Sequence, residues 1–162
     1  MQRTGISRCS FYYYFKTKEG FGAELIDRYR HFITQKLERC LSDTSLSPLG
    51  SLRTFVGEVR DEMARTDCRS GCLVGKLAQE VNTLPENFRE QLSAVFAEWQ
   101  AVFARGLKRA QETGEISPEL DCASTAAFFW YGWEGALQRA NLELNIKPVD
   151  IFIGNFFSRL TG

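Results

Sequence analysis

Apolar residues recur every three or four positions along most of the chain, and this spacing constrains the fold more than any other feature. It places apolar side chains on one face of an α-helix, whereas a half-buried strand would show strict alternation. No segment alternates in that way, and no internal repeat or low-complexity tract is present. We therefore predict an all-α protein, with helices over residues 18–41, 48–65, 85–113 and 121–144, another from residue 147 onward, and a short one between Cys72 and Pro85.

A dense motif lies near the start of the chain, from Gly5 to Glu19. Ser7 is a good N-cap for a short helix over about residues 7–14, and Thr17 is a second cap before the long helix that follows. A short helix joined to a longer one by a tight turn is typical of a helix-turn-helix recognition element. The motif is rich in hydrogen-bond donors and has no carboxylate before Glu19, which favours contact with phosphates and bases.

The order Gly-Ile-Ser-x-x-Ser-Phe-Tyr-x-Tyr-Phe-x-x-Lys-Glu in this motif resembles the recognition helix and following turn of the TetR/AcrR family of bacterial transcriptional repressors. The resemblance implies a helical repressor that binds operator DNA. On the matching positions, it implies DNA contacts by Arg8, Cys9, Ser10, Tyr12, Tyr13, Tyr14 and Lys18. Cys9 departs from the small residue that is usual at its position, so the resemblance does not imply a particular operator sequence.

The same resemblance implies two further helices before the recognition helix, yet only residues 1–4 precede Gly5. We therefore expect a truncated helix-turn-helix head with its connecting helix in residues 1–41, followed by a TetR-like ligand-binding and dimerisation body in residues 42–162. The leading hypothesis is a homodimeric repressor that a small-molecule effector, with electrophiles as one class, releases from its operator. The alternative is a dimeric module that senses a ligand or the redox state of a thiol and does not bind DNA in this truncated form.

Charge and cysteine usage bound the class of protein. Residues 1–40 hold 8 Lys or Arg against 4 Asp or Glu, and residues 41–162 hold 12 against 16, so the basic end agrees with contact to nucleic acid. Five cysteines, no secretory signal and no apolar run of membrane-spanning length predict free thiols, a cytoplasmic location and no membrane partner. With one histidine and no nucleophile, phosphate-loop or paired-carboxylate motif, the sequence predicts no enzyme, no metal site and no other cofactor.

The last two predicted helices carry more apolar residues than one helix face can hold, and residues 126–133 are apolar almost all round. Because a monomer rarely exposes so much apolar surface, these helices predict a four-helix bundle between two copies of the chain. The alternative is that all faces are buried within one copy. The resemblance implies the same dimer, which would place two recognition helices on successive major grooves. The predicted interface residues are Gly132, Gly135, Ala136, Ile153, Phe156 and Phe157.

The helical body is expected to hold a small-molecule site, which in proteins is mostly apolar with a few placed polar groups. Glu134 is the most informative residue, because a carboxylate within an apolar helix must find a partner, a ligand or solvent. The aromatic residues, among them Trp133, would form the walls, although each fits a plain core position as well. The predicted ligand-binding residues are Phe55, Val59, Met63, Cys72, Trp99, Phe103, Trp130 and Glu134.

Cys72 follows Gly71 at the expected start of the short helix. The partial positive charge of a helix N terminus, together with nearby Arg69 and Lys76, would lower the pKa of its thiol. Cys72 is therefore a candidate for redox or electrophile sensing, with Cys68 as a resolving thiol. The alternative is a buried and inert cysteine.

Overall fold

The computed structural model describes residues 18–162, and most of that range is helical. The residues described contain no strand, which confirms the all-α prediction. The predicted recognition helix lies outside them. The elements in order are α2 (Lys18–Ser42), α3 (Pro48–Arg65), α4 (Leu73–Gln79), the short 3-10 helix η1 (Val81–Thr83), α5 (Glu86–Glu112), α6 (Cys122–Glu143) and α7 (Lys147–Thr161).

Two helix starts are set by side-chain caps. The Ser47 hydroxyl accepts a hydrogen bond from the backbone N–H of Gly50 at 3.1 Å, at the start of α3. The Asp121 carboxylate accepts one from the backbone N–H of Ser124 at 3.0 Å, at the start of α6. Each cap satisfies a donor that has no partner within the first turn of its helix, and so fixes where the helix begins.

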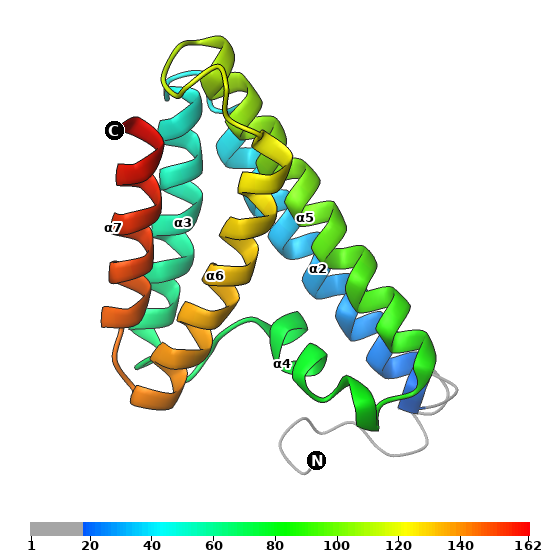
Figure 1. Cartoon of the computed structure of the whole chain (residues 1–162). Helices are drawn as coiled ribbons and strands as arrows, with labels where there is room; N and C mark the ends of the chain where they lie inside the picture. Colours follow the sequence, from blue (N-terminus) through cyan, green and yellow to red (C-terminus); the bar gives the residue numbers. More distant parts are fainter. Residues whose placement is uncertain (1–17) are drawn as a thin grey trace.

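The helices form a triangular body that is closed at one end and open at the other (Figure 1). The long helices α2 and α5 run side by side along one edge, and α3, α6 and α7 form the opposite side. The two sides meet at the end that carries the α2–α3 and α5–α6 connections, and α4 spans the opening between them (Figure 1). Side chains from both sides of the triangle line a cavity inside the body.

An ion pair and close packing hold the long helices together. Arg30 of α2 forms an ion pair with Glu98 of α5 at 2.9 Å. Near the closed end, Gly106 lets α5 pack tightly against α2 and α3, because a Cβ atom there would lie 2.7 Å from the Leu52 side chain.

Between residues 18 and 162, no helix is long and apolar enough to cross a membrane.

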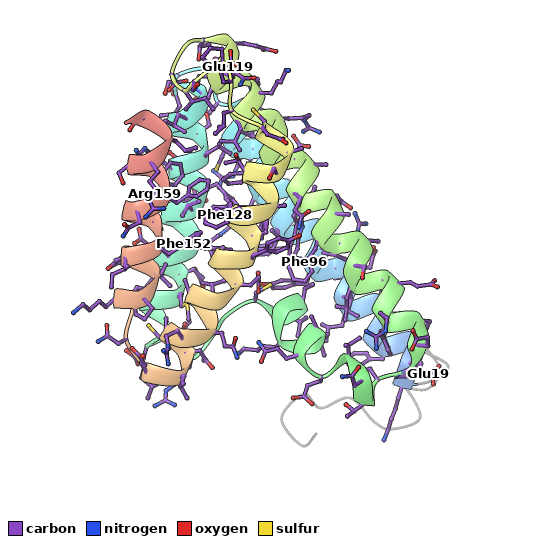
Figure 2. All side chains as sticks on the ribbon, viewed as in Figure 1. Glu19, Phe96, Glu119, Phe128, Phe152 and Arg159 are labelled. Carbon is purple, nitrogen blue, oxygen red and sulfur yellow. The ribbon has the colours of Figure 1, made fainter. Side chains whose placement is uncertain are left out.

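The α6–α7 side carries an exposed apolar face. Phe128 and Ile151 are 59% and 54% exposed, and Tyr131 is 71% exposed. Figure 2 shows Phe128, Phe152 and Arg159 on this side of the molecule, where they line a shallow groove between α6 and α7. We call the surface formed by Phe128, Tyr131, Ile151 and Phe152 the α6–α7 face.

Most of the predicted interface residues pack within one protomer. Phe156 and Phe157 are only 5% and 0% exposed and pack largely in the core of one protomer, so their part in an intermolecular interface stays a prediction. Gly132 faces the Phe152 ring, which a Cβ atom would overlap, so it serves close packing of α6 on α7 within one protomer. Gly135 is exposed with open space around its Cα. The half-buried Ala136 and Ile153 pack against the core of the protomer.

Candidate ligand-binding site

A cavity of about 170 Å³ lies inside the triangle, between α2, α3, α5 and α6 and the segment that leads into α4. Its walls are mainly apolar and aromatic, with a few polar groups. Drug-sized ligands occupy pockets of about 300–1,000 Å³ in proteins, so this cavity suits a smaller molecule. The lining residues are Tyr29, Phe32, Ile33, Lys36, Phe55, Val59, Glu62, Met63, Ser70, Gly71, Cys72, Trp99, Trp130, Trp133, Glu134 and Leu137.

All three tryptophans of the chain, Trp99, Trp130 and Trp133, line this cavity. Trp99 of α5 stacks on Trp130 of α6 with ring centroids 5.2 Å apart, and Tyr29 of α2 meets Trp99 edge to face at 6.2 Å. Phe55 of α3 completes the aromatic wall, 6.5 Å from Trp130. Each of the helices α2, α3, α5 and α6 therefore contributes at least one aromatic ring to the cavity wall.

Glu134 brings a carboxylate to this aromatic wall. Its Oε1 atom is buried and has no hydrogen-bond partner among the described residues, and no described basic side chain forms an ion pair with it. Gly75 of α4 makes room for the other oxygen, since a Cβ atom at Gly75 would overlap Oε2. Burial raises the pKa of Glu134 from 4.5 to about 7, and a hydrogen bond with Cys72 opposes this rise only in part.

Cys72 caps α4, because its Sγ atom accepts a hydrogen bond from the backbone N–H of Gly75 at 3.4 Å. The prediction that the helix start lowers the pKa of this thiol is wrong. Burial and the neighbouring carboxylate of Glu134 raise the pKa, and the backbone N–H of Gly75 counters only a part of that effect. Cys72 is therefore protonated at neutral pH.

Tyr29 lies beside this pair of groups. Its hydroxyl donates a hydrogen bond to the backbone oxygen of Gly71 at 3.4 Å, and burial raises its pKa as well. Tyr29, Cys72 and Glu134 thus form one buried polar cluster on the wall of the cavity, contributed by α2, the start of α4 and α6. An occupant that contacts this cluster touches all three elements.

The structure brings seven of the eight predicted ligand-binding residues together on this cavity: Phe55, Val59, Met63, Cys72, Trp99, Trp130 and Glu134. Phe103 is the exception, because it lies deeper in the core and stacks on Phe129 with ring centroids 4.1 Å apart. Cys68, the proposed resolving thiol, is buried and does not line the cavity. No group of His, Cys, Asp and Glu side chains within residues 18–162 is arranged to hold a metal ion.

Sequence reasoning missed the contribution of α2, which lines the cavity with Tyr29, Phe32, Ile33 and Lys36. The signal was present, since these residues follow helical spacing and share one face. We had expected α2 only to connect the DNA-binding end to the body. Of the seven predicted DNA-contacting residues, only Lys18 is described; it is exposed in the first turn of α2, and the other six lie outside the described residues.

The described residues thus form a helical body with an internal cavity, and comparison with known families shows the class of protein. Residues 48–156 match the family described as "Tetracyclin repressor-like, C-terminal domain". The chain therefore belongs to the TetR family of transcription regulators, and the resemblance seen in the N-terminal motif is confirmed. Members of this family are regulators and not enzymes.

Two curated relatives and one solved structure make the likeness specific. The chain is 42% identical to the transcriptional regulator AcuR of Cereibacter sphaeroides, over 93% of the chain and 69% of that protein. It is 28% identical to the transcriptional repressor DhaR of a Mycobacterium species, over 96% of the chain and 76% of that protein. The crystal structure of a TetR regulatory protein from Rhodobacter sphaeroides aligns with a TM-score of 0.90 at 42% identity, covering 93% of this chain and 80% of that one.

Proposed function

We propose that the protein is a homodimeric repressor of transcription, and that a small molecule bound in the cavity releases it from operator DNA. The observation that carries this proposal is the position of α2. The helix begins at Lys18, one of the predicted DNA contacts, and four of its residues line the cavity further along. A ligand that displaces this part of α2 would therefore change the position of the DNA-binding end.

The proposed DNA contacts are Arg8, Cys9, Ser10, Tyr12, Tyr13, Tyr14 and Lys18. They rest on the recognition motif and on the family to which the chain belongs. The test is fluorescence anisotropy of labelled DNA from upstream of the protein's own gene. We expect specific binding that weakens steeply as salt rises, because basic groups that contact phosphates release counterions. Arg8→Ala should weaken binding, whereas Lys108→Ala, at an exposed position of α5, should not; equal binding to unrelated DNA would contradict the proposal.

The proposed dimer uses the α6–α7 face. Support comes from the exposure of Phe128 and Ile151, which line one groove between α6 and α7, because an exposed apolar face of this kind marks an association surface. Phe128→Glu should convert the dimer to a monomer in light scattering coupled to size-exclusion chromatography. The matched control is Leu25→Glu, at an exposed apolar position of α2. A Phe128→Glu variant that keeps the mass of a dimer would contradict this interface.

The alternative function, a dimeric module that senses ligands or thiol redox state without binding DNA, predicts no operator binding by this chain. In that case Cys72 would be the reacting group, with Cys68 as a resolving thiol. Because Cys72 is buried and protonated, it meets an electrophile as a thiol, which reacts far more slowly than a thiolate. Reversible occupation of the cavity therefore has more support than covalent modification, and mass spectrometry after treatment with an electrophile distinguishes the two.

A further inference from the structure

We propose that the cavity selects a small organic cation, with the carboxylate of Glu134 as its counter-ion and the indole rings as the surfaces that hold its apolar groups. This inference rests on the proposed function, since it names the chemical class of the effector. It follows from two independent features of the cavity wall, the buried carboxylate without a cationic partner and the arrangement of the aromatic rings.

The first feature is a buried acid that lacks a partner of opposite charge. Glu134 Oε1 makes no hydrogen bond with any described residue, and its neighbours Cys72 and Tyr29 are neutral groups whose pKa values are raised. A carboxylate in such surroundings is costly unless a cation or a hydrogen-bond donor reaches it. The cavity therefore presents a negative group that a ligand can neutralise.

The basic side chains near the cavity are engaged elsewhere. Lys36, at the α2 wall, places its Nζ atom 5.3 Å from the centroid of the Phe32 ring. Lys76 donates to the backbone oxygen of Ser70 at 3.2 Å. The other acid on the cavity wall, Glu62, forms an ion pair with an arginine of its own helix, so Glu134 is the carboxylate left for a ligand.

The second feature is the set of aromatic rings that line the same cavity. Trp99, Trp130, Trp133 and Tyr29 come from three helices and surround the same small space. Aromatic rings attract cations through the negative potential of their faces, and tryptophan does so most strongly. Rings of this kind together with one carboxylate form a site for an ammonium group that carries methyl or methylene groups.

An anionic ligand fits the same wall poorly. The Glu134 carboxylate and the backbone oxygen of Gly71, which already accepts the Tyr29 hydroxyl proton, both repel a negative group. Lys36 is the one basic side chain among the described lining residues, and it lies against the Phe32 ring. A carboxylate ligand at Glu134 would thus face an acid, whereas a cation finds a counter-ion there already.

The test compares choline with 3,3-dimethylbutan-1-ol, a neutral molecule of the same shape in which carbon replaces the charged nitrogen. Because all three tryptophans line the cavity, intrinsic fluorescence reports directly on its occupation. We expect choline, tetramethylammonium or butylammonium to give a saturable change, with choline binding at least about tenfold more tightly than its neutral counterpart. Glu134→Gln should abolish that preference, and Glu143→Gln, at an exposed position of the same helix, should retain it.

The pH dependence gives a second readout. Choline affinity should rise as the pH increases through about 7, because a protonated Glu134 cannot act as a counter-ion. The groups around Glu134 that could contribute are Tyr29, Cys72, Lys36 and Lys76, and the first two remain protonated in this range. Glu134→Gln should remove the pH dependence.

Three outcomes would overturn the inference: no saturable binding by any of the three cations at millimolar concentrations, equal binding of the neutral isostere, or an unchanged preference in Glu134→Gln. Failure of the proposed function has a different signature. If cations bind the cavity but leave operator binding unchanged, the class of ligand stands and its role as effector falls. If neutral or anionic compounds release the operator while cations do not bind, the role stands and the class of ligand falls.

Discussion

Replacing Glu134 with Gln should stabilise the protein, and the gain should depend on pH. The folded protein holds the pKa of this carboxyl near 7, above its ordinary value of 4.5, because the group is buried without a charged partner. Between these two pH values, the folded state binds a proton that the unfolded state releases. The contribution of the protonated group to stability is therefore complete at acidic pH and is lost as the pH rises through 7.

The size of this effect follows from the two pKa values. A rise from 4.5 to about 7 corresponds to roughly 3 kcal/mol of lost stability in the wild-type protein at pH 8, relative to acidic pH. Gln keeps the shape of the protonated acid but does not ionise. The free energy of unfolding of Glu134→Gln should match that of the wild type near pH 4.5 and exceed it by about 1–3 kcal/mol at pH 8.

Urea denaturation, followed by tryptophan fluorescence at a fixed protein concentration, measures this difference at a series of pH values. The matched control is Glu143→Gln, because Glu143 lies on α6 as well but is exposed and pairs with Arg139. A difference between Glu134→Gln and the wild type that stays constant from about pH 5 to about pH 8 would refute the reasoning. It would mean that the carboxylate has a partner or solvent in the folded protein.

Three substitutions and one chemical reaction test the packing of the site and of α6. Gly75→Ala should destabilise the protein by about 1–3 kcal/mol in urea denaturation, because the new methyl group overlaps the buried carboxylate; an unchanged midpoint would contradict that contact. Gly132→Ala should also lower the melting temperature, since it overlaps an aromatic ring of α7, whereas Gly135→Ala has open space and should raise it through helix propensity; the same sign for both would refute this assignment. Iodoacetamide at pH 7 should modify the protonated Cys72 no faster than the half-buried Cys122, as measured by peptide mass spectrometry, and faster reaction at Cys72 would show that a thiolate is present.

Much of the fold could be predicted from the sequence, because its helices have clear chemical boundaries. Ser47 and Pro48 mark the start of α3, Asp121 marks the start of α6, and the expected ranges agree with the observed helices to within about two residues. Apolar spacing also identified most of the cavity wall on α3, α5 and α6. The division of the chain at residues 41 and 42 stays a prediction.

The remaining features depend on how helices pack against one another, which periodicity alone does not specify. Phe103 and Trp99 lie four positions apart on α5, yet one stacks in the core and the other lines the cavity. Apolar spacing does not distinguish a residue at a protein interface from one in the core, and Phe157, which we predicted at the interface, is fully buried. The pKa of Cys72 was predicted from its helix start, whereas burial beside Glu134, distant in sequence, determines its direction.

The most direct test of the account is the affinity for operator DNA with the cavity empty and with it occupied. Fluorescence anisotropy should be recorded on DNA from upstream of the protein's own gene, without ligand and with a compound that saturates the tryptophan signal. The account predicts specific, salt-sensitive binding that weakens at least about tenfold when the cavity is filled. Specific DNA binding that is unchanged by a filled cavity, or the absence of specific DNA binding, would contradict it.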